Sequence, residues 1–108
     1  MKLYRQSPQI RTRQLGTQTI LVDIKKNDYL KAPTLLHLNS TGRCIWNLLQ
    51  KPQSVQEVAS AFYSGLTSDV DLSRVEKETE RFIQRLWEMG YLILEEKEEN
   101  ANNGLQSY

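Results

Sequence analysis

The segment Leu38-Asn39-Ser40-Thr41-Gly42-Arg43-Cys44-Ile45-Trp46-Asn47-Leu48-Leu49 is the point where the periodicity of this chain changes from strand to helix. Either Asn39 or Ser40 offers a side-chain oxygen that can accept an N–H from the first turn of a helix. The apolar residues behind this cap recur at helical spacing and predict a broad buried stripe. They are Cys44, Ile45, Trp46, Leu48 and Leu49.

Two further helices are predicted downstream of this segment. Ser54-Val55-Gln56-Glu57 is a capping box, which starts a second helix that ends at Gly65. Asp71 or Ser73 caps a long third helix that closes at Gly90. The apolar face of this third helix consists of Leu72, Val75, Thr79, Phe82, Ile83 and Leu86. The apolar stretch 91–94 follows as a short final strand or an apolar extension.

Upstream of the opening segment the pattern is that of strands. Residues 10–15 alternate in character, Gly16 supplies a turn, and residues 19–24 are rich in β-branched side chains, which together predict a hairpin. Residues 29–32 and 34–38 form one strand interrupted at Pro33 or two short strands. Because proline has no N–H to donate, we expect this segment at a sheet edge or in a bulge.

The order of these elements predicts an α+β fold. We expect a winged helix-turn-helix with an N-terminal three-stranded antiparallel sheet followed by three helices. Residues 1–96 are predicted to form one domain, because 108 residues with 39% hydrophobic and 25% charged side chains suit a single globular unit. Residues 97–108 turn acidic and then amide-rich, which predicts a disordered tail.

Composition also bears on the cellular setting. The formal net charge is +1, so no strong field attracts nucleic acid or anionic lipid. The single cysteine suits a reducing compartment, and no apolar run approaches the length that crosses a bilayer. We therefore expect a cytoplasmic protein that binds neither nucleic acid nor membrane.

The sequence predicts no catalytic or metal-binding set. His37 is the only histidine, and the five glycines are scattered at turns and helix ends rather than gathered in a phosphate-binding loop. Cys44 is expected to pack in the core as a small hydrophobe, and Trp46 and Trp87 are expected to be partly buried. We expect no enzymatic activity, no cofactor and no metal.

Two other functions stay open from the residues alone. A helix-turn-helix outline suits a DNA-binding transcriptional regulator, and Arg74, Lys77, Arg81 and Arg85 form one basic stripe on the third helix. The same helix carries acids at four of its first ten positions, 71–80, and these would repel phosphates. The other alternative is an interaction subunit without peptide specificity.

The opening segment resembles the LN-x-TG-x-x-IW-x-LL signature of the PqqD-like family, whose members are also called RiPP recognition elements. Residues 54–59 are similar to the family's TVEELA helix start, and residues 69–71 with Phe82, Leu86 and 90–92 are similar to its closing helix. The resemblance covers residues 10–94. Residues 30–35 also resemble the LKSPTL stretch of the mycofactocin-system member.

This resemblance implies a peptide chaperone that does no chemistry itself. Family members bind the leader segment of a ribosomally made precursor peptide and present it to a modifying enzyme. That enzyme is a radical-SAM enzyme or, in lasso-peptide systems, a leader peptidase. The leader is added to the sheet as an extra strand, in the cleft between the edge strand and the third helix. The chain is expected to be a monomer or a homodimer.

The resemblance also implies the peptide-binding residues. On the strand these are Thr34, Leu35, Leu36 and His37, although residues 29–31 are an alternative pairing strand. On the third helix they are Val75, Thr79 and Phe82 in the wall of the cleft and Arg74, Lys77 and Arg81 at its rim. Apolar anchors of this kind set affinity, and rim charges set the choice of partner.

Overall fold

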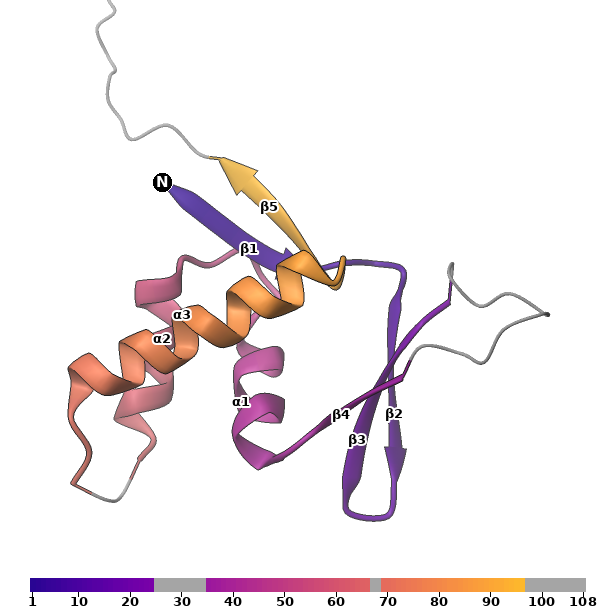
Figure 1. The fold of residues 1–108 in the computed structure, drawn as a ribbon, viewed down its shortest axis with the longest axis horizontal. Coiled ribbons are helices and arrows are strands. Elements are labelled where there is room, and N and C mark those ends of the chain that lie inside the picture. The colour runs from indigo at the N-terminus through magenta and orange to yellow at the C-terminus, as the bar shows by residue number, and fades with distance from the viewer. Residues whose placement is uncertain (25–34, 67–68, 97–108) are drawn as a thin grey trace, which may run out of the picture.

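The computed structural model describes residues 1–24, 35–66 and 69–96. Its elements, in chain order, are β1 Lys2–Gln6, β2 Ile10–Leu15, β3 Gln18–Asp23, β4 Leu35–Leu38, α1 Ser40–Leu48, α2 Val55–Ser64, α3 Leu72–Glu88 and β5 Leu92–Glu96 (Figure 1). The predicted α+β class, hairpin and three helices are confirmed, and the winged helix-turn-helix description stays a prediction. Residues 29–31, Thr34 and the predicted tail 97–108 lie outside the described residues.

The strands β2, β3 and β4 form one antiparallel sheet in that order. Gly16, with φ of 63°, makes the turn between β2 and β3, in a conformation that favours glycine. The register places Thr12 opposite Leu21, and Leu21 opposite Leu36, so the three residues form a row across one face of the sheet. The Trp46 indole donates to Thr12 Oγ1 at 3.2 Å, which shows that α1 packs against this face.

A second sheet pairs the two ends of the described chain, and this pairing was not predicted. Strand β1 lies antiparallel to β5, from Lys2 opposite Glu96 to Gln6 opposite Leu92 (Figure 1). The stretch 91–94 therefore contributes to a strand and is not an apolar extension. On its other side, Tyr4 exchanges backbone hydrogen bonds of 2.8 and 2.9 Å with Gln53, so β1 also joins the segment before α2.

Local side-chain caps fix the starts of all three helices. Asn39 accepts the Gly42 N–H at 2.7 Å, and Asp71 accepts the Ser73 N–H at 3.2 Å, so these two residues are the caps among the predicted alternatives. The capping box at α2 is confirmed, with Ser54 and Glu57 bonded reciprocally. These caps satisfy N–H groups that a helix leaves unpaired at its first turn.

The core lies between the helices and both sheets. Its fully buried side chains include Trp46, Leu49, Val58, Leu86 and Tyr91. The predicted burial of Cys44 is wrong, because α1 turns Ile45, Trp46 and Leu49 inward and leaves Cys44 exposed on its outer side. Partial burial was also predicted for both tryptophans. It is wrong for Trp46, which is only 1% exposed, and it holds for Trp87, which is 40% exposed.

One buried pair of polar groups lies at the junction of the two sheets. Asp23 at the end of β3 is fully buried, and Tyr91 just before β5 is 1% exposed. The pKa of the Tyr91 hydroxyl lies above its ordinary value of 10.0. The main cause is burial, and the negative charge of Asp23 adds to it. Within the described residues this hydroxyl makes no hydrogen bond.

Candidate functional site

A groove of about 330 Å³ lies between strand β4 and helix α3. Its β4 side and its floor come from Leu36, His37, Leu38 and Asn39 together with Thr41, Gly42 and Ile45 of α1 and Phe62 of α2. Its far wall is one face of α3, formed by Val75, Glu78, Thr79, Phe82, Arg85 and Leu86. The inner surface is mainly aliphatic and aromatic, so the groove suits apolar side chains.

Among the described strands, β4 is an outer strand of its sheet. Among the strands that the structure describes, it pairs with β3 alone, so its other edge carries backbone donors and acceptors without a strand partner. Side chains alternate along β4: Leu36 is half-buried and Leu38 is buried, whereas Leu35 and His37 are exposed. Leu36 and Leu38 thus belong to the buried face of the strand.

Gly42 keeps the groove open where α1 approaches α3. A Cβ atom at this position would lie 3.2 Å from Phe82 Cζ and 3.3 Å from Asn39 Oδ1, closer than most side chains tolerate. The Phe82 ring therefore occupies the space that any larger residue at Gly42 would need. This contact places the ring in the wall of the groove.

Two opposite charges on α3 belong to the groove, and the sequence-based site missed both. Glu78 and Arg85 line it on either side of Phe82 along the helix. Their positions follow the i, i+4, i+7 spacing that also includes Phe82, so helical periodicity could have identified them. Phe62 and Gly42 were missed as well, because they come from helices whose approach to α3 is set by tertiary packing.

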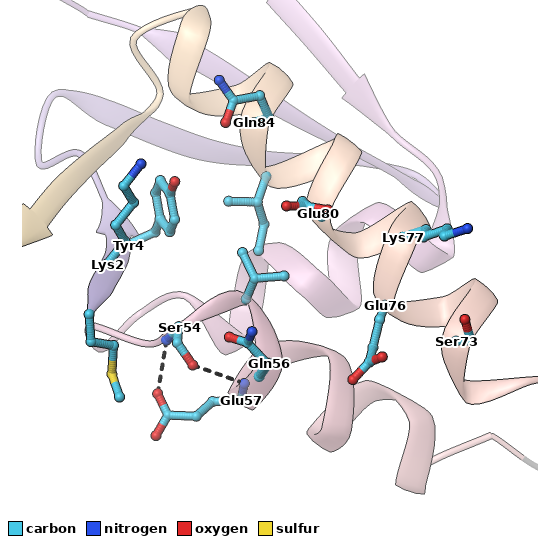
Figure 2. Close-up of a pocket in the computed structure, with 13 residues that line it drawn as sticks. Lys2, Tyr4, Ser54, Gln56, Glu57, Ser73, Glu76, Lys77, Glu80 and Gln84 are labelled. Carbon is cyan, nitrogen blue, oxygen red and sulfur yellow. Dashed lines mark hydrogen bonds between the residues drawn. The ribbon is translucent and has the colours of Figure 1, made fainter.

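The three basic residues predicted for the rim are not among those that line the groove. Lys77 lines a second, larger cleft between β1, the start of α2 and α3, together with Glu76 and Glu80 (Figure 2). Arg74 is exposed, and its Nε lies 3.3 Å from Glu78 Oε2. Arg81 is exposed too, and neither arginine is among the residues that line the groove.

The other predicted site residues fall into two groups. Leu36, His37, Val75, Thr79 and Phe82 come together in the groove. Within the α3 wall, Val75 and Thr79 are buried, whereas Phe82 is half-buried and available to a ligand. Leu35 lies on β4 and is exposed, outside the set that lines the groove.

Two further findings concern the described part of the chain, one on metal binding and one on membrane spans. No group of three or more His, Cys, Asp or Glu side chains that could hold a metal ion occurs within it. No helix there is long and apolar enough to span a membrane.

Comparison with known proteins gives one family and two similar structures. The sequence model for "Coenzyme PQQ synthesis protein D (PqqD)" matches residues 18–92, which contain β3, β4, all three helices and the groove. No curated protein matches the chain.

Two solved structures share the fold. The structure "TbiB1 in Complex with the TbiA(beta) Leader Peptide" has a TM-score of 0.65 and 20% identity, covering 82% of this chain and 93% of the other. The structure "Lasso peptide synthetase B1 complexed with the leader peptide" has a TM-score of 0.65 and 22% identity, covering 83% and 96%. The family match extends over more than half of the sequence, and the chain belongs to the PqqD family.

Proposed function

We propose that this protein binds the leader segment of a ribosomally synthesised precursor peptide and delivers it to a modifying enzyme. The observation that carries this proposal is the open edge of β4 beside the apolar groove against α3. Membership of the PqqD family supports it, as do the two similar structures, both of which contain leader peptides.

The arrangement provides the two components that strand addition needs. Backbone groups on the open edge of β4 can hydrogen-bond an extended peptide and fix its register. Alternate peptide side chains then point toward α3, where Leu36 and Phe82 offer partly exposed apolar surface. Burying one large apolar side chain contributes about 1.5–3 kcal/mol, so a few anchors with the backbone bonds reach micromolar affinity, about −8 kcal/mol.

The protein has a delivering role and no chemistry of its own in this proposal. The enzyme that receives the leader is a radical-SAM enzyme or a leader peptidase. An open strand edge can also pair with a second copy, so the leader and a β4-paired homodimer would compete for the same edge. A DNA-binding role is not favoured, because α3 begins with a carboxylate cap at Asp71 and carries further acids at Glu76, Glu78 and Glu80.

Fluorescence anisotropy tests the proposal. The probes are labelled synthetic peptides that match the N-terminal halves of the short reading frames beside this gene. A labelled DNA duplex at physiological salt tests the alternative, DNA binding. We expect saturable binding of one peptide and none of the duplex. Duplex binding without a peptide response would overturn the proposal.

A matched pair of variants locates the site. Phe82→Asp places a carboxylate in the groove wall and should weaken peptide binding at least thirtyfold, since a buried charge without a partner is strongly unfavourable. Gln84→Asp puts the same charge on the exposed opposite side of α3, where Gln84 lines the second cleft (Figure 2). If circular dichroism shows both variants to be folded and their peptide affinities are equal, the groove is excluded as the peptide-binding site.

A further inference from the structure

The groove carries an ordered pair of opposite charges, and this order has a consequence for what it binds. Glu78 lies one turn before Phe82 on α3 and Arg85 lies almost one turn after it, and all three line the groove. With a rise of about 1.5 Å per residue, the Cα atom of Glu78 is about 6 Å before that of Phe82 along the helix axis, and the Cα atom of Arg85 is about 4.5 Å after it. The apolar anchor point is thus flanked by a negative and a positive side chain.

An added strand matches this spacing. Residues two apart in a strand point to the same face and are separated by about 6.6–6.8 Å. When one peptide side chain sits against Phe82, the side chains two residues before and two after it lie within reach of Glu78 and Arg85. A peptide with charged, apolar and charged residues at alternate positions therefore satisfies all three contacts at once.

The fold also sets the direction of that pattern. In Figure 1, strand β4 runs toward the start of α1, whereas α3 runs in the opposite direction. Every strand pairing in the described residues is antiparallel, so we take the added strand to run antiparallel to β4 and hence in the direction of α3. The N-terminal part of the peptide then lies near Glu78 and the C-terminal part near Arg85.

The existing ion pair leaves Glu78 available. Its carboxylate lies 3.3 Å from Arg74, but the two side chains are 61% and 74% exposed. Such exposed pairs are weak, so a basic peptide side chain can replace or share the Arg74 contact. Arg85 has no ion-pair partner within the described residues.

We infer that the groove selects leaders that carry a basic, an apolar and an acidic residue at alternate positions, in that order from N- to C-terminus. This inference rests on the proposed leader-binding function. It names the class of peptide that the site accepts and the residues that choose it.

A displayed peptide library tests the inference with the full chain as bait. The library is a fifteen-residue Thr/Ser-rich host in which three alternate central positions are randomised, and enrichment is read by sequencing. We expect an apolar residue at the central position and base before acid at the flanking positions. The preference over the reversed order should be about three- to tenfold, as expected for two rim charge pairs.

A charge-swapped variant gives the decisive comparison. Glu78→Lys with Arg85→Glu preserves net charge and should reverse the preference, so that acid precedes base. The control, Lys2→Glu with Glu76→Lys, swaps charges across the second cleft and should enrich the same peptides as the wild type.

The possible results separate the two ideas. The inference is overturned if the library enriches a central apolar residue but shows no preferred order of the flanking charges. It is also overturned if the Glu78/Arg85 swap leaves the preferred order unchanged. Both results are compatible with peptide binding in the groove. Enrichment of acid before base by the wild type overturns the inferred direction and with it the inference. Absence of any enrichment, including that of the apolar anchor, overturns both the inference and the proposed function.

Discussion

Gly42 is the residue on which the shape of the groove depends most directly. Its missing side chain lets α1 approach Phe82 of α3, and a Cβ atom there would meet the ring at 3.2 Å. The same glycine donates its N–H to the Asn39 cap at 2.7 Å, so it contributes both to the start of α1 and to the shape of the groove. A substitution at Gly42 is therefore expected to change leader binding more than stability.

Gly42→Ala should weaken leader binding severalfold with little loss of stability. Alanine favours the helix over glycine by about 1 kcal/mol, which offsets the strain of the close contact. The displaced Phe82 ring, however, narrows the groove. Gly65→Ala is the control, because a Cβ there has its nearest contact at 3.6 Å. Equal leader affinity for both variants in anisotropy titrations would contradict this role of Gly42.

Tyr91 should make the protein sensitive to alkaline pH. Its folded-state pKa lies above the ordinary value of 10.0, so the folded state holds the proton more tightly than the unfolded chain. This contribution is fully present below pH 10 and is lost as pH rises through the folded-state pKa. Urea unfolding at pH 8 and pH 11 measures this loss. Between the two pH values the free energy of unfolding should fall more for the wild type than for Tyr91→Phe.

At neutral pH, Tyr91→Phe should not lower the free energy of unfolding. The Tyr91 hydroxyl is buried without a hydrogen bond in the described residues, so its removal is expected to be neutral or to stabilise by about 1 kcal/mol. Tyr63→Phe, at a half-buried tyrosine of α2, is the control and should retain the alkaline loss. A wild type and Tyr91→Phe with identical pH dependence would refute the prediction.

At the scale of elements, the helix starts carry stability that can be tested one cap at a time. Ser54 is 4% exposed, accepts the Glu57 N–H at 3.1 Å and donates its own N–H to Glu57 Oε1 at 2.8 Å. Helix α2 packs Val58 and Ala59 into the core, so fraying at its start exposes the interior.

Ser54→Ala should lower the free energy of unfolding by about 1 kcal/mol, within the range of 0.5–2 kcal/mol for lost helix caps. Urea denaturation measures this change. Ser73→Ala is the control: its side chain is exposed in the first turn of α3 and the cap there is Asp71, so its stability should stay near that of the wild type. Two equal losses would mean that the capping box has no special role.

The elements that could be predicted from the sequence are those with local signals. The caps at Asn39, Ser54 and Asp71 and the turn at Gly16 depend on residues a few positions apart. Strand β1 was missed because Lys2–Gln6 contains no β-branched residue and its partner β5 is distant in sequence. The pairing becomes favourable only once the rest of the fold brings the two segments together.

The groove could be predicted in part, because the family resemblance pointed to Leu36, Val75 and Phe82 as site residues, and all three line it. The helical spacing of α3 explains why Val75 and Phe82 lie on one face of that helix. The sequence shows a basic stripe on α3 but not how the helix is rotated against β4, so it could not indicate which charged side chains line the groove. That rotation turns Glu78 and Arg85 toward the groove and Lys77 toward the second cleft.

At the scale of the whole molecule, the two-stranded sheet lies outside the groove. Strands β1 and β5 lie at one end of the fold, apart from the β4 edge (Figure 1). The family match begins at residue 18, so β1 lies outside it. Tyr4 in β1 is nevertheless 6% exposed and belongs to the core.

Tyr4→Ala should therefore separate stability from binding. Loss of a buried aromatic side chain costs about 3–5 kcal/mol, and urea unfolding should show a decrease of this size. Leader affinity, measured at a temperature where the variant is folded, should be unchanged because Tyr4 does not line the groove. A parallel loss of affinity in the folded variant would show that β1 supports the site.

The pairing of Lys2 with Glu96 also has a kinetic consequence. It closes almost the whole described chain into a loop, and the entropy of loop closure makes such a contact unfavourable until shorter-range structure has formed. The β2–β3 hairpin and the helices are expected to set the rate of folding, and β1 to join afterwards. Detachment of β1 is then an early step of unfolding, so contacts in β1 govern the lifetime of the native state more than the speed at which it forms.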